Sequence, residues 1–347
     1  MNKVIAFILA LSLVFCCVGC GNSDSTQISD EVIIIEEEEL IYEGGDTVSD
    51  NNEVSSNVSQ ETESVDTSVS SEESSIVSSD TSSVIEEPQK QEINIDYEWK
   101  SHPDDFKLLA FTFDDGPGDL MPQYVSYFAA FEGAGTFFVN GTKLTNDYAY
   151  KKMQNAINYG WDIGNHGDQH LVATIGGTNG SPATYDALRA DIDTLTNKLE
   201  SKLKFPDGSP YEVSSYRAPN IKPTEHTFKI CDEEKFPIIW LKYDALDWDN
   251  TKTYKDRYNV FKNGIGTWED GDIILCHEVQ TYAQETYQIL EELLPDFYRA
   301  GYRFCSVSEL MELRGITRDQ ICGELNEVDG NRGMVTNIVE AAKQGKK

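Results

Sequence analysis

Two adjacent carboxylates, Asp114 and Asp115, stand in the run Thr-Phe-Asp-Asp-Gly-Pro, directly after an apolar stretch at residues 108–113. Two buried carboxylates would repel each other, and a cation bound to one of them removes that conflict. One carboxylate could then ligate a metal while the other acts as a base beside it. Asp-Gly and Gly-Pro are also common turn dipeptides, so a solvated turn is the alternative interpretation of this motif alone.

A pair of histidines follows another apolar segment. His166 and His170 are spaced as His-x-x-x-His and are two of only five histidines in the chain. Such a pair can be incidental, but together with Asp115 it makes two imidazoles and one carboxylate with a position left for water, the ligand count of a catalytic zinc site. We therefore predict one divalent metal ion, with zinc as the first choice and cobalt or another divalent ion compatible with the same donors.

Three further polar residues fall at or just beyond apolar segments. Arg217 could pair with a carboxylate and orient it, or could be purely structural. His277 is a candidate general acid because the pKa of histidine lies near neutral pH, and Asp247 could hold its tautomer and raise that pKa. The alternative for His277 is a hydrogen-bonded histidine without a catalytic role. Trp248 is either a core residue or a wall for a sugar ring.

The elements that must position these residues alternate between strand and helix. Helical spacing of apolar residues occurs at 185–203 and 281–298, and Gly160 and Gly301 stand where a helix ends before a strand. This alternation predicts a parallel α/β barrel or a doubly wound sheet, in which the carboxyl ends of the strands carry the reactive groups. Seven strands are expected, at 108–113, 136–139, 161–164, 214–217, 238–243, 272–276 and 302–307.

The ordered set of motifs resembles the polysaccharide deacetylases of carbohydrate esterase family 4, the NodB-homology domain, over about residues 105–315. The resemblance implies a distorted (β/α)7 barrel. It also implies that Asp114 is the catalytic base and that Asp115, His166 and His170 are the metal ligands. Gly167 stands where the family has a hydroxyl residue between the two histidines.

The remaining motifs of the resemblance assign supporting roles. Arg217 would steady the base, His277 would be the acid and Asp247 would be its partner. The backbone N–H after Pro219 would stabilise the oxyanion, and Asn220 replaces the aromatic residue usual in the family. The residues expected to line the substrate groove are Pro219, Asn220, Trp248 and Leu275.

The N-terminal region is predicted to direct the chain out of the cell. Lys3, an apolar run at 4–18 and the sequence Cys17-Val18-Gly19-Cys20 resemble a lipoprotein signal peptide at 1–20, with Cys20 as the lipidated residue. An ordinary signal peptide or an uncleaved anchor is the alternative. Residues 21–100 carry 22 acidic side chains against two lysines and are rich in serine, which predicts a disordered tether.

The predicted organisation is therefore a signal peptide at 1–20, a tether at 21–100, a deacetylase domain at 101–315 and a tail at 316–347 with a helix at 335–343. The net charge of −32 argues against a nucleic-acid partner. We expect a lipid-anchored enzyme on the outer face of a bacterial membrane that removes acetyl groups from N-acetylglucosamine in peptidoglycan. Alternatives are an O-deacetylase of acetylated xylan and a non-catalytic carbohydrate-binding lipoprotein.

Overall fold

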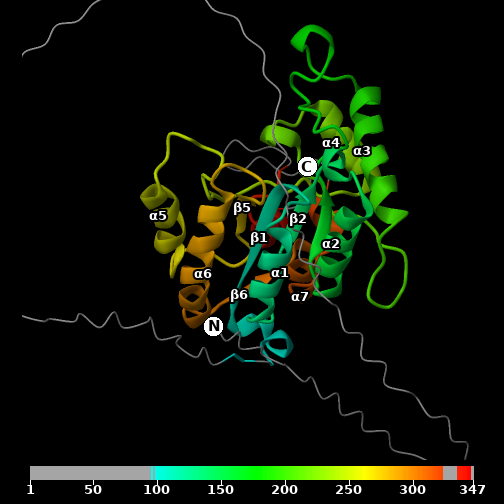
Figure 1. The fold of residues 1–347 in the computed structure, drawn as a ribbon. Helices are drawn as coiled ribbons and strands as arrows, with labels where there is room; N and C mark the ends of the chain where they lie inside the picture. Colours follow the sequence, from blue (N-terminus) through cyan, green and yellow to red (C-terminus); the bar gives the residue numbers. More distant parts are fainter. Residues whose placement is uncertain (1–94, 97, 323–333, 345–347) are drawn as a thin grey trace, which may run out of the picture. The chain divides into compact units, whose positions relative to one another are not determined.

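The computed structural model describes residues 95–96, 98–322 and 334–344 (Figure 1). The predicted signal peptide, its Cys20 and the tether as far as residue 94 lie outside the described residues. Within the described part of the chain, no helix combines the length and the hydrophobicity needed to cross a membrane.

A parallel sheet forms the centre of the domain. Its strands run in the order β3-β2-β1-β5-β4, and β6 pairs with the first half of β1. The strands are β1 (Lys107–Gly116), β2 (Thr136–Val139), β3 (Asp162–Asn165), β4 (Tyr243–Asp244), β5 (Ile273–His277) and β6 (Tyr302–Cys305).

Single-residue bridges close this sheet into a barrel. Asn165 at the end of β3 bridges to Tyr216, and Tyr216 bridges in turn to Ile238. Ile238 lies on the segment that continues into β4, which pairs with β5. The circuit of parallel pairings is thereby complete, and the prediction of a distorted α/β barrel is confirmed.

Two of the seven expected strands are much shorter than predicted. The segment 214–217 pairs only around Tyr216, and 238–243 is reduced to bridges at 238–239 and the two-residue β4. Pro219 and Pro237 flank these pairings. A proline has no N–H to donate to a ladder, so pairing cannot extend beyond these ends. Within 238–243, Ile239 bridges to Val335 and the N–H of Trp240 donates to the carbonyl of Val335 at 2.8 Å, so this segment pairs with the C-terminal segment.

The alternation of side chains along β1 separates two layers of packing. Phe111 and Phe113 belong to the larger core cluster beneath the helices, whereas Leu108 and Ala110 belong to a second cluster that contains Phe138 and Ile273. Successive side chains of a strand point to opposite faces. Thr112 and Asp114 therefore share the face of Ala110. Asp114 lies inside the barrel, near the carboxyl end of β1.

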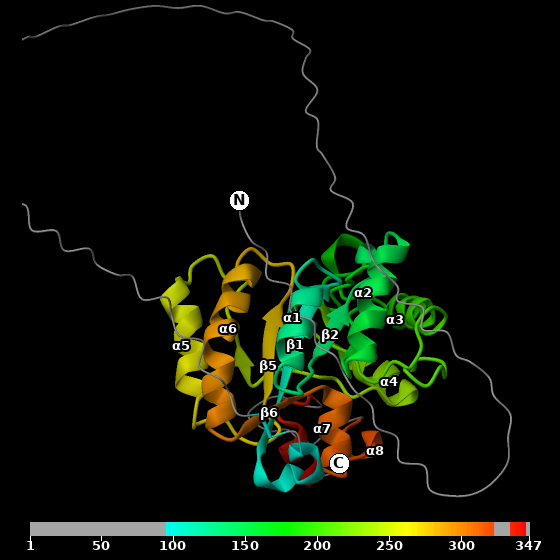
Figure 2. The ribbon, with the colours of Figure 1, turned by 60° about the horizontal axis from the view of Figure 1, so that its bottom comes forward.

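Helices cover the outside of the sheet. Neighbouring helices pack in pairs, α1 with α2, α3 with α4 and α5 with α6 (Figures 1 and 2). The principal helices are α1 (Met121–Ala129), α2 (Asp147–Asn158), α3 (Tyr185–Glu200), α4 (Glu225–Glu234), α5 (Tyr254–Gly264), α6 (Ala283–Arg299) and α7 (Val307–Leu313). Residues 160 and 301 have positive φ angles of 83° and 89° before β3 and β6, as expected of glycines that end a helix.

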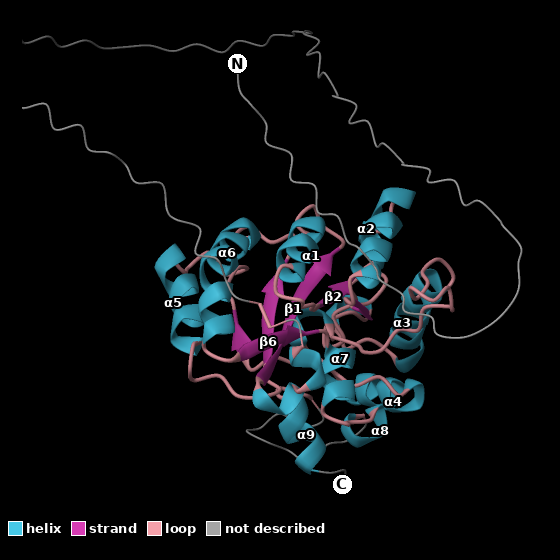
Figure 3. Ribbon diagram, turned by 90° about the horizontal axis from the view of Figure 1, so that it is seen from below, coloured by secondary structure: helices cyan, strands magenta, loops and turns pink. Residues whose placement is uncertain are grey.

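The packed region extends beyond residues 101–315 on both sides. Trp99 is fully buried and shares a cluster with Ile321, Val335 and Ile338. The short helices α8 (Arg318–Ile321) and α9 (Ile338–Gln344) lie beside each other at the end of the domain seen in Figure 3. The last helix begins later than predicted because Val335 bridges in parallel to Ile239 and is therefore extended.

Candidate active site

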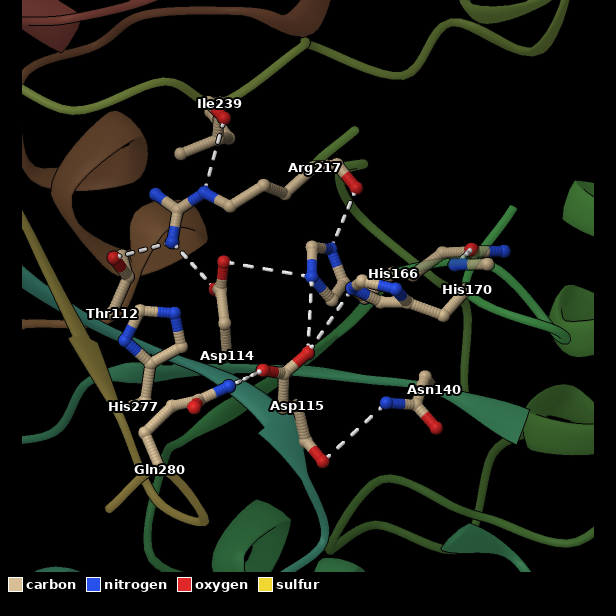
Figure 4. A network of polar contacts seen from close by, with 12 residues as sticks. Thr112, Asp114, Asp115, Asn140, His166, His170, Arg217, Ile239, His277 and Gln280 are labelled. Atoms are coloured by element: carbon tan, nitrogen blue, oxygen red, sulfur yellow. Dashed lines mark hydrogen bonds and ion pairs between the residues drawn. The ribbon is translucent and has the colours of Figure 1, made fainter. Parts of the chain in front are cut away.

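The structure brings the predicted reactive residues to one end of the barrel. Asp114 and Asp115 lie near the end of β1, and His277 is the last residue of β5. His166 and His170 come from the loop that follows β3 (Figure 4). All five side chains line one cavity of about 650 Å³. Their convergence follows from the parallel sheet, because the carboxyl ends of its strands meet at the same edge.

Asp115 and the two histidines form a compact donor set. Oδ1 of Asp115 lies 3.2 Å from Nε2 of His170 and 3.5 Å from Nε2 of His166, and the three ligand atoms all lie within 4.8 Å of one another. Nδ1 of His166 is 2.8 Å from the carbonyl oxygen of Arg217. A carbonyl can only accept, so Nδ1 donates and leaves Nε2 unprotonated in the neutral ring, the arrangement typical of a metal-bound histidine. These residues fit a divalent ion such as zinc.

The electrostatics of Asp115 agree with a ligand role. Burial acts to raise the pKa of this carboxyl, but its interactions with the neighbouring imidazoles of His166 and His170 outweigh burial and hold the pKa far below its usual range. The residue is therefore an anionic donor at any physiological pH. Its backbone has a φ angle of 70°, an uncommon conformation for a residue other than glycine.

Asp191 on α3 braces the loop that carries the two histidines. Its Oδ1 accepts from the backbone N–H of Gln169 at 2.7 Å, while Oδ1 of Asn165 accepts from the N–H of Gly167 at 2.8 Å. Residue 167 has a φ angle of 81°, and a Cβ there would lie 2.5 Å from Oδ2 of Asp191. A glycine is therefore required at residue 167, because any other side chain would be strained at this φ angle and would clash with Asp191. The sequence offered no signal for Asp191, which lies in a regular helix.

Arg217 is fully buried and holds Asp114. Its Nη1 donates to Oδ1 of Asp114 and to Oγ1 of Thr112, both at 2.7 Å. Nε and Nη2 donate to the carbonyl oxygens of residues 239 and 240 at 3.2 and 2.7 Å. The guanidinium also lies over the ring of Phe138, 4.4 Å from its centroid. The structure therefore supports the interpretation in which Arg217 pairs with a carboxylate and orients it.

Both oxygens of Asp247 contact His277. Oδ1 is 2.6 Å from Nδ1 of the ring, and Oδ2 accepts from the backbone N–H of the same residue at 2.8 Å. Burial acts to lower the pKa of His277, but the hydrogen bond and charge of Asp247 outweigh it and raise the pKa from 6.5 to about 9. Because Nδ1 contacts Asp247, Nε2 is the ring nitrogen that is available to a molecule in the cavity. A pKa of about 9 means that the ring is protonated at neutral pH. This is the state a general acid requires.

The proposed substrate residues line the cavity, with one exception. Asn220, Trp248 and Leu275 are on its wall, and the indole of Trp248 is 52% exposed while its N–H donates to Asp244. Pro219 is buried and does not line the cavity. It opens the short turn Pro219–Ile221 that presents Asn220. Ile221 also lines the cavity, and further wall residues that the sequence did not point to are Lys222, Leu241 and Gln280.

Unusual backbone conformations gather around the cavity. Positive φ angles between 52° and 70° occur at five non-glycine residues that belong to the strand-end loops and turns, namely Asp115, His170, Asn220, Ile221 and Leu246. Such conformations cost about 1–3 kcal/mol each and persist where the surroundings impose them. The concentration of strain at this end of the barrel is typical of a functional site.

Two residues of the turn after β5 also contact the end of β1 and the loop that follows it. Gln280 donates from Nε2 to Oδ2 of Asp115 at 2.6 Å (Figure 4). Oε2 of the buried Glu278 accepts from the N–H of Gly118 at 2.9 Å. Burial raises the pKa of Glu278 from 4.5 to about 8. These contacts join positions about 160 residues apart, so no local pattern could reveal them.

Comparisons with known proteins agree with this geometry. The family model described as polysaccharide deacetylase matches residues 101–232. A peptidoglycan-N-acetylglucosamine deacetylase of Bacillus cereus is 30% identical over 216 residues, which cover 61% of this chain and 92% of that protein.

Two solved structures share the fold. The Xyl-CE4 domain of a multidomain xylanase from the hindgut metagenome of Trinervitermes trinervoides is 24% identical, with a TM-score of 0.54 over 69% of this chain and 99% of that one. A family 4 acetyl xylan esterase from Clostridium thermocellum, in complex with a cobalt ion, is 26% identical, with a TM-score of 0.50 over 61% and 94% of the two chains. The 30% identity covers 92% of the Bacillus cereus protein, and the family model matches the same domain. This chain therefore belongs to the polysaccharide deacetylase family.

Proposed function

We propose that this protein is a metal-dependent deacetylase that removes acetyl groups from N-acetylglucosamine units of a cell-wall glycan, with peptidoglycan as the first candidate. The observation that carries the proposal is the placement of a base and an acid beside one donor set. Asp114 and His277 are register partners on adjacent strands, and Asp115 with the two histidines lies in the same cavity. Metal-assisted hydrolysis of an amide uses a base, an acid and a bound ion together.

The residues of the chain supply the proton transfers. When bound, a divalent ion would activate a water molecule and stabilise the negative charge that develops on the acetyl oxygen. Asp114 accepts the proton of the attacking water, and Arg217 fixes the direction of its carboxylate. As the water oxygen bonds to the acetyl carbon and the C–N bond breaks, His277 gives its proton to the departing sugar nitrogen. Asp247 stabilises the imidazolium that makes this donation.

Several residues would hold and orient the sugar. The exposed face of Trp248 offers an apolar surface for a pyranose ring. The backbone N–H of Asn220, at the turn after Pro219, is our candidate for a second contact to the oxyanion. Zinc is the proposed native metal because two imidazoles and one carboxylate match its usual donors.

The peptidoglycan substrate is supported by the named activity of the Bacillus cereus relative. It also fits the proposed location, in which Cys20 is lipidated and the segment that ends at residue 94 tethers the domain at the outer face of the membrane. A second candidate is the O-deacetylation of acetylated xylan, which is favoured by the similarity to the Clostridium thermocellum acetyl xylan esterase. The catalytic groups serve either reaction, since both begin with attack on an acetyl carbonyl.

A single assay separates these candidates. The purified protein is stripped with a chelator, and acetate release is measured with and without added zinc or cobalt on N-acetylglucosamine oligomers, peptidoglycan and acetylated xylan. We expect metal-dependent release, fastest on peptidoglycan, that is lost in Asp114→Asn. Faster release from xylan would select the second candidate. Release from no substrate by a metal-loaded protein would instead favour a binding protein.

A further inference from the structure

Gln280 contacts the side of Asp115 that faces away from the histidines. The two oxygens of this carboxylate have different partners. Oδ1 lies 3.2 Å from Nε2 of His170 and 3.5 Å from Nε2 of His166. Oδ2 accepts a hydrogen bond from Nε2 of Gln280 at 2.6 Å. Figure 4 shows the amide on the opposite side of the carboxylate from the imidazoles. Gln280 is half-buried and lines the cavity.

This contact determines which oxygen of Asp115 is available. A carboxylate can turn about its bond to Cβ, and it can offer a cation either one oxygen or two. The short hydrogen bond from a neutral amide holds Oδ2 and leaves Oδ1 toward the histidines. The amide is suited to this task because it donates a hydrogen bond without adding a charge beside the anionic ligand.

The backbone on either side of the contact supports the same role. The carbonyl oxygen of Asp115 accepts from Nδ2 of Asn140 at 3.4 Å. Gln280 follows β5 by only three residues, and its turn is tied to the β1 loop by Glu278, whose Oε2 accepts from Gly118. The donor therefore stands on a turn that is itself anchored to the segment that carries the ligand.

We propose that Gln280 is a positioning residue for the metal site: by holding Oδ2 of Asp115, it presents Oδ1 to the ion and sets the affinity of the site. This inference rests on the proposed metal-dependent function, but it does not depend on which acetylated glycan is the substrate. Outer hydrogen bonds of this kind usually change metal affinity by about 10- to 100-fold when removed.

The test is a metal titration in which no substrate is needed. Chelator-stripped wild-type protein and Gln280→Met are titrated with zinc in competition with a chromophoric chelator, and with cobalt while the visible absorption of the bound ion is recorded. Methionine keeps the length of the side chain and removes the donor. The matched control is Gln123→Met, an exposed position of α1. Gln280→Ala is a second variant, and circular dichroism reports the folding of each protein.

We expect the zinc dissociation constant of Gln280→Met and Gln280→Ala to rise about 10- to 100-fold, with a changed cobalt spectrum. Gln123→Met should match the wild type in both measurements. Gln280 variants that bind zinc within twofold of the wild type, with the same cobalt spectrum, would overturn the inference and leave the proposed function intact. Wild-type protein that binds neither ion would reject the metal site and this inference together.

Discussion

Arg217 and Asp114 form a buried ion pair, in which Nη1 lies 2.7 Å from Oδ1 and neither side chain is more than 3% exposed. The pair joins the bridge segment around Tyr216 to the end of β1, across the interior of the barrel. A buried pair of this kind is weak evidence for stability as a whole, because burial of both charges is costly. Substitution of only one of the two residues lowers the stability of the domain, since the other charge stays buried without a partner.

We therefore predict that Arg217→Met destabilises the domain by about 3–5 kcal/mol, the cost of leaving a buried carboxylate unpaired. Arg217→Lys should also be destabilising, because an ammonium cannot reproduce the fork that reaches Thr112, Asp114 and two carbonyl groups. Urea unfolding measures both changes.

Arg189→Lys is the matched control, since Arg189 pairs with three acidic residues in partly exposed positions. We expect a cost below about 1 kcal/mol there. Equal costs at positions 189 and 217 would show that the buried pair has no special role.

The pH dependence of activity should follow the His277–Asp247 pair. The pKa of His277 is raised to about 9, so the acid stays protonated through neutral pH and activity should decline as the pH rises through about 9. Asp247→Asn removes the charge that raises the pKa. The alkaline limb of the kcat/KM profile, which reports the pKa values of the free enzyme, should then move down, toward the ordinary value of 6.5.

Asp249→Asn serves as the control for this profile, because Asp249 accepts from Thr251 in an exposed turn two residues away. Its alkaline limb should remain that of the wild type. An unchanged limb in Asp247→Asn would assign the alkaline decline to a group other than His277.

Glu278 should make the stability of the domain fall with rising pH. Burial raises the pKa of this carboxyl from 4.5 to about 8, so the folded state binds more protons than the unfolded state between those values. Stability then decreases as the pH rises through this window. Glu278→Gln has no such titration. Its free energy of unfolding relative to the wild type should increase from pH 5 to pH 9 by a few kcal/mol, at about 1.4 kcal/mol per pKa unit.

Urea unfolding at the two pH values measures this difference. Glu312→Gln, at an exposed position of α7, should show the same difference from the wild type at both. A flat difference for Glu278→Gln as well would mean that the buried carboxyl does not titrate in this range.

Gly167→Ala should disturb the histidine loop beyond the cost of its backbone conformation. Gly208 has a similar φ angle of 85°, and nothing lies within 4 Å of the place that a Cβ would take there, whereas a Cβ at residue 167 would lie 2.5 Å from Oδ2 of Asp191. We expect Gly208→Ala to cost about 1 kcal/mol from the backbone alone.

Gly167→Ala should cost more than Gly208→Ala and should also weaken metal binding, since the methyl group displaces Asp191 from the loop between the two ligands. Unfolding and zinc titration of the two variants measure these effects. Equal destabilisation with unchanged zinc affinity would contradict the bracing role of Asp191.

The strand-to-helix alternation and the residue types at strand ends were readable from the sequence because both are local. The apolar run that ends in Asp114 and Asp115 predicts a strand, and a parallel sheet places every such ending at one edge. The positions of His166, His170 and His277 after apolar segments therefore predict that they share one site. Pairing at 214–217 and 238–243 is less extensive than predicted, and residues 239–240 pair with the distant Val335.

What only the tertiary structure decided is which groups meet across the barrel. Gln280 reaches Asp115 and Glu278 reaches Gly118 over about 160 residues, and Asp191 supports a loop more than 20 residues away. The same holds for the burial of Trp99 against Val335 and Ile338. The sequence by itself determined the alternation of strands and helices and the candidate reactive groups, because hydrophobic periodicity and residue chemistry are properties of short segments. Periodicity left a barrel and a doubly wound sheet as alternatives, and the family resemblance favoured the barrel. Their supporting partners were decided by closure of the fold, because a hydrogen bond between distant segments depends on geometry that no single segment contains.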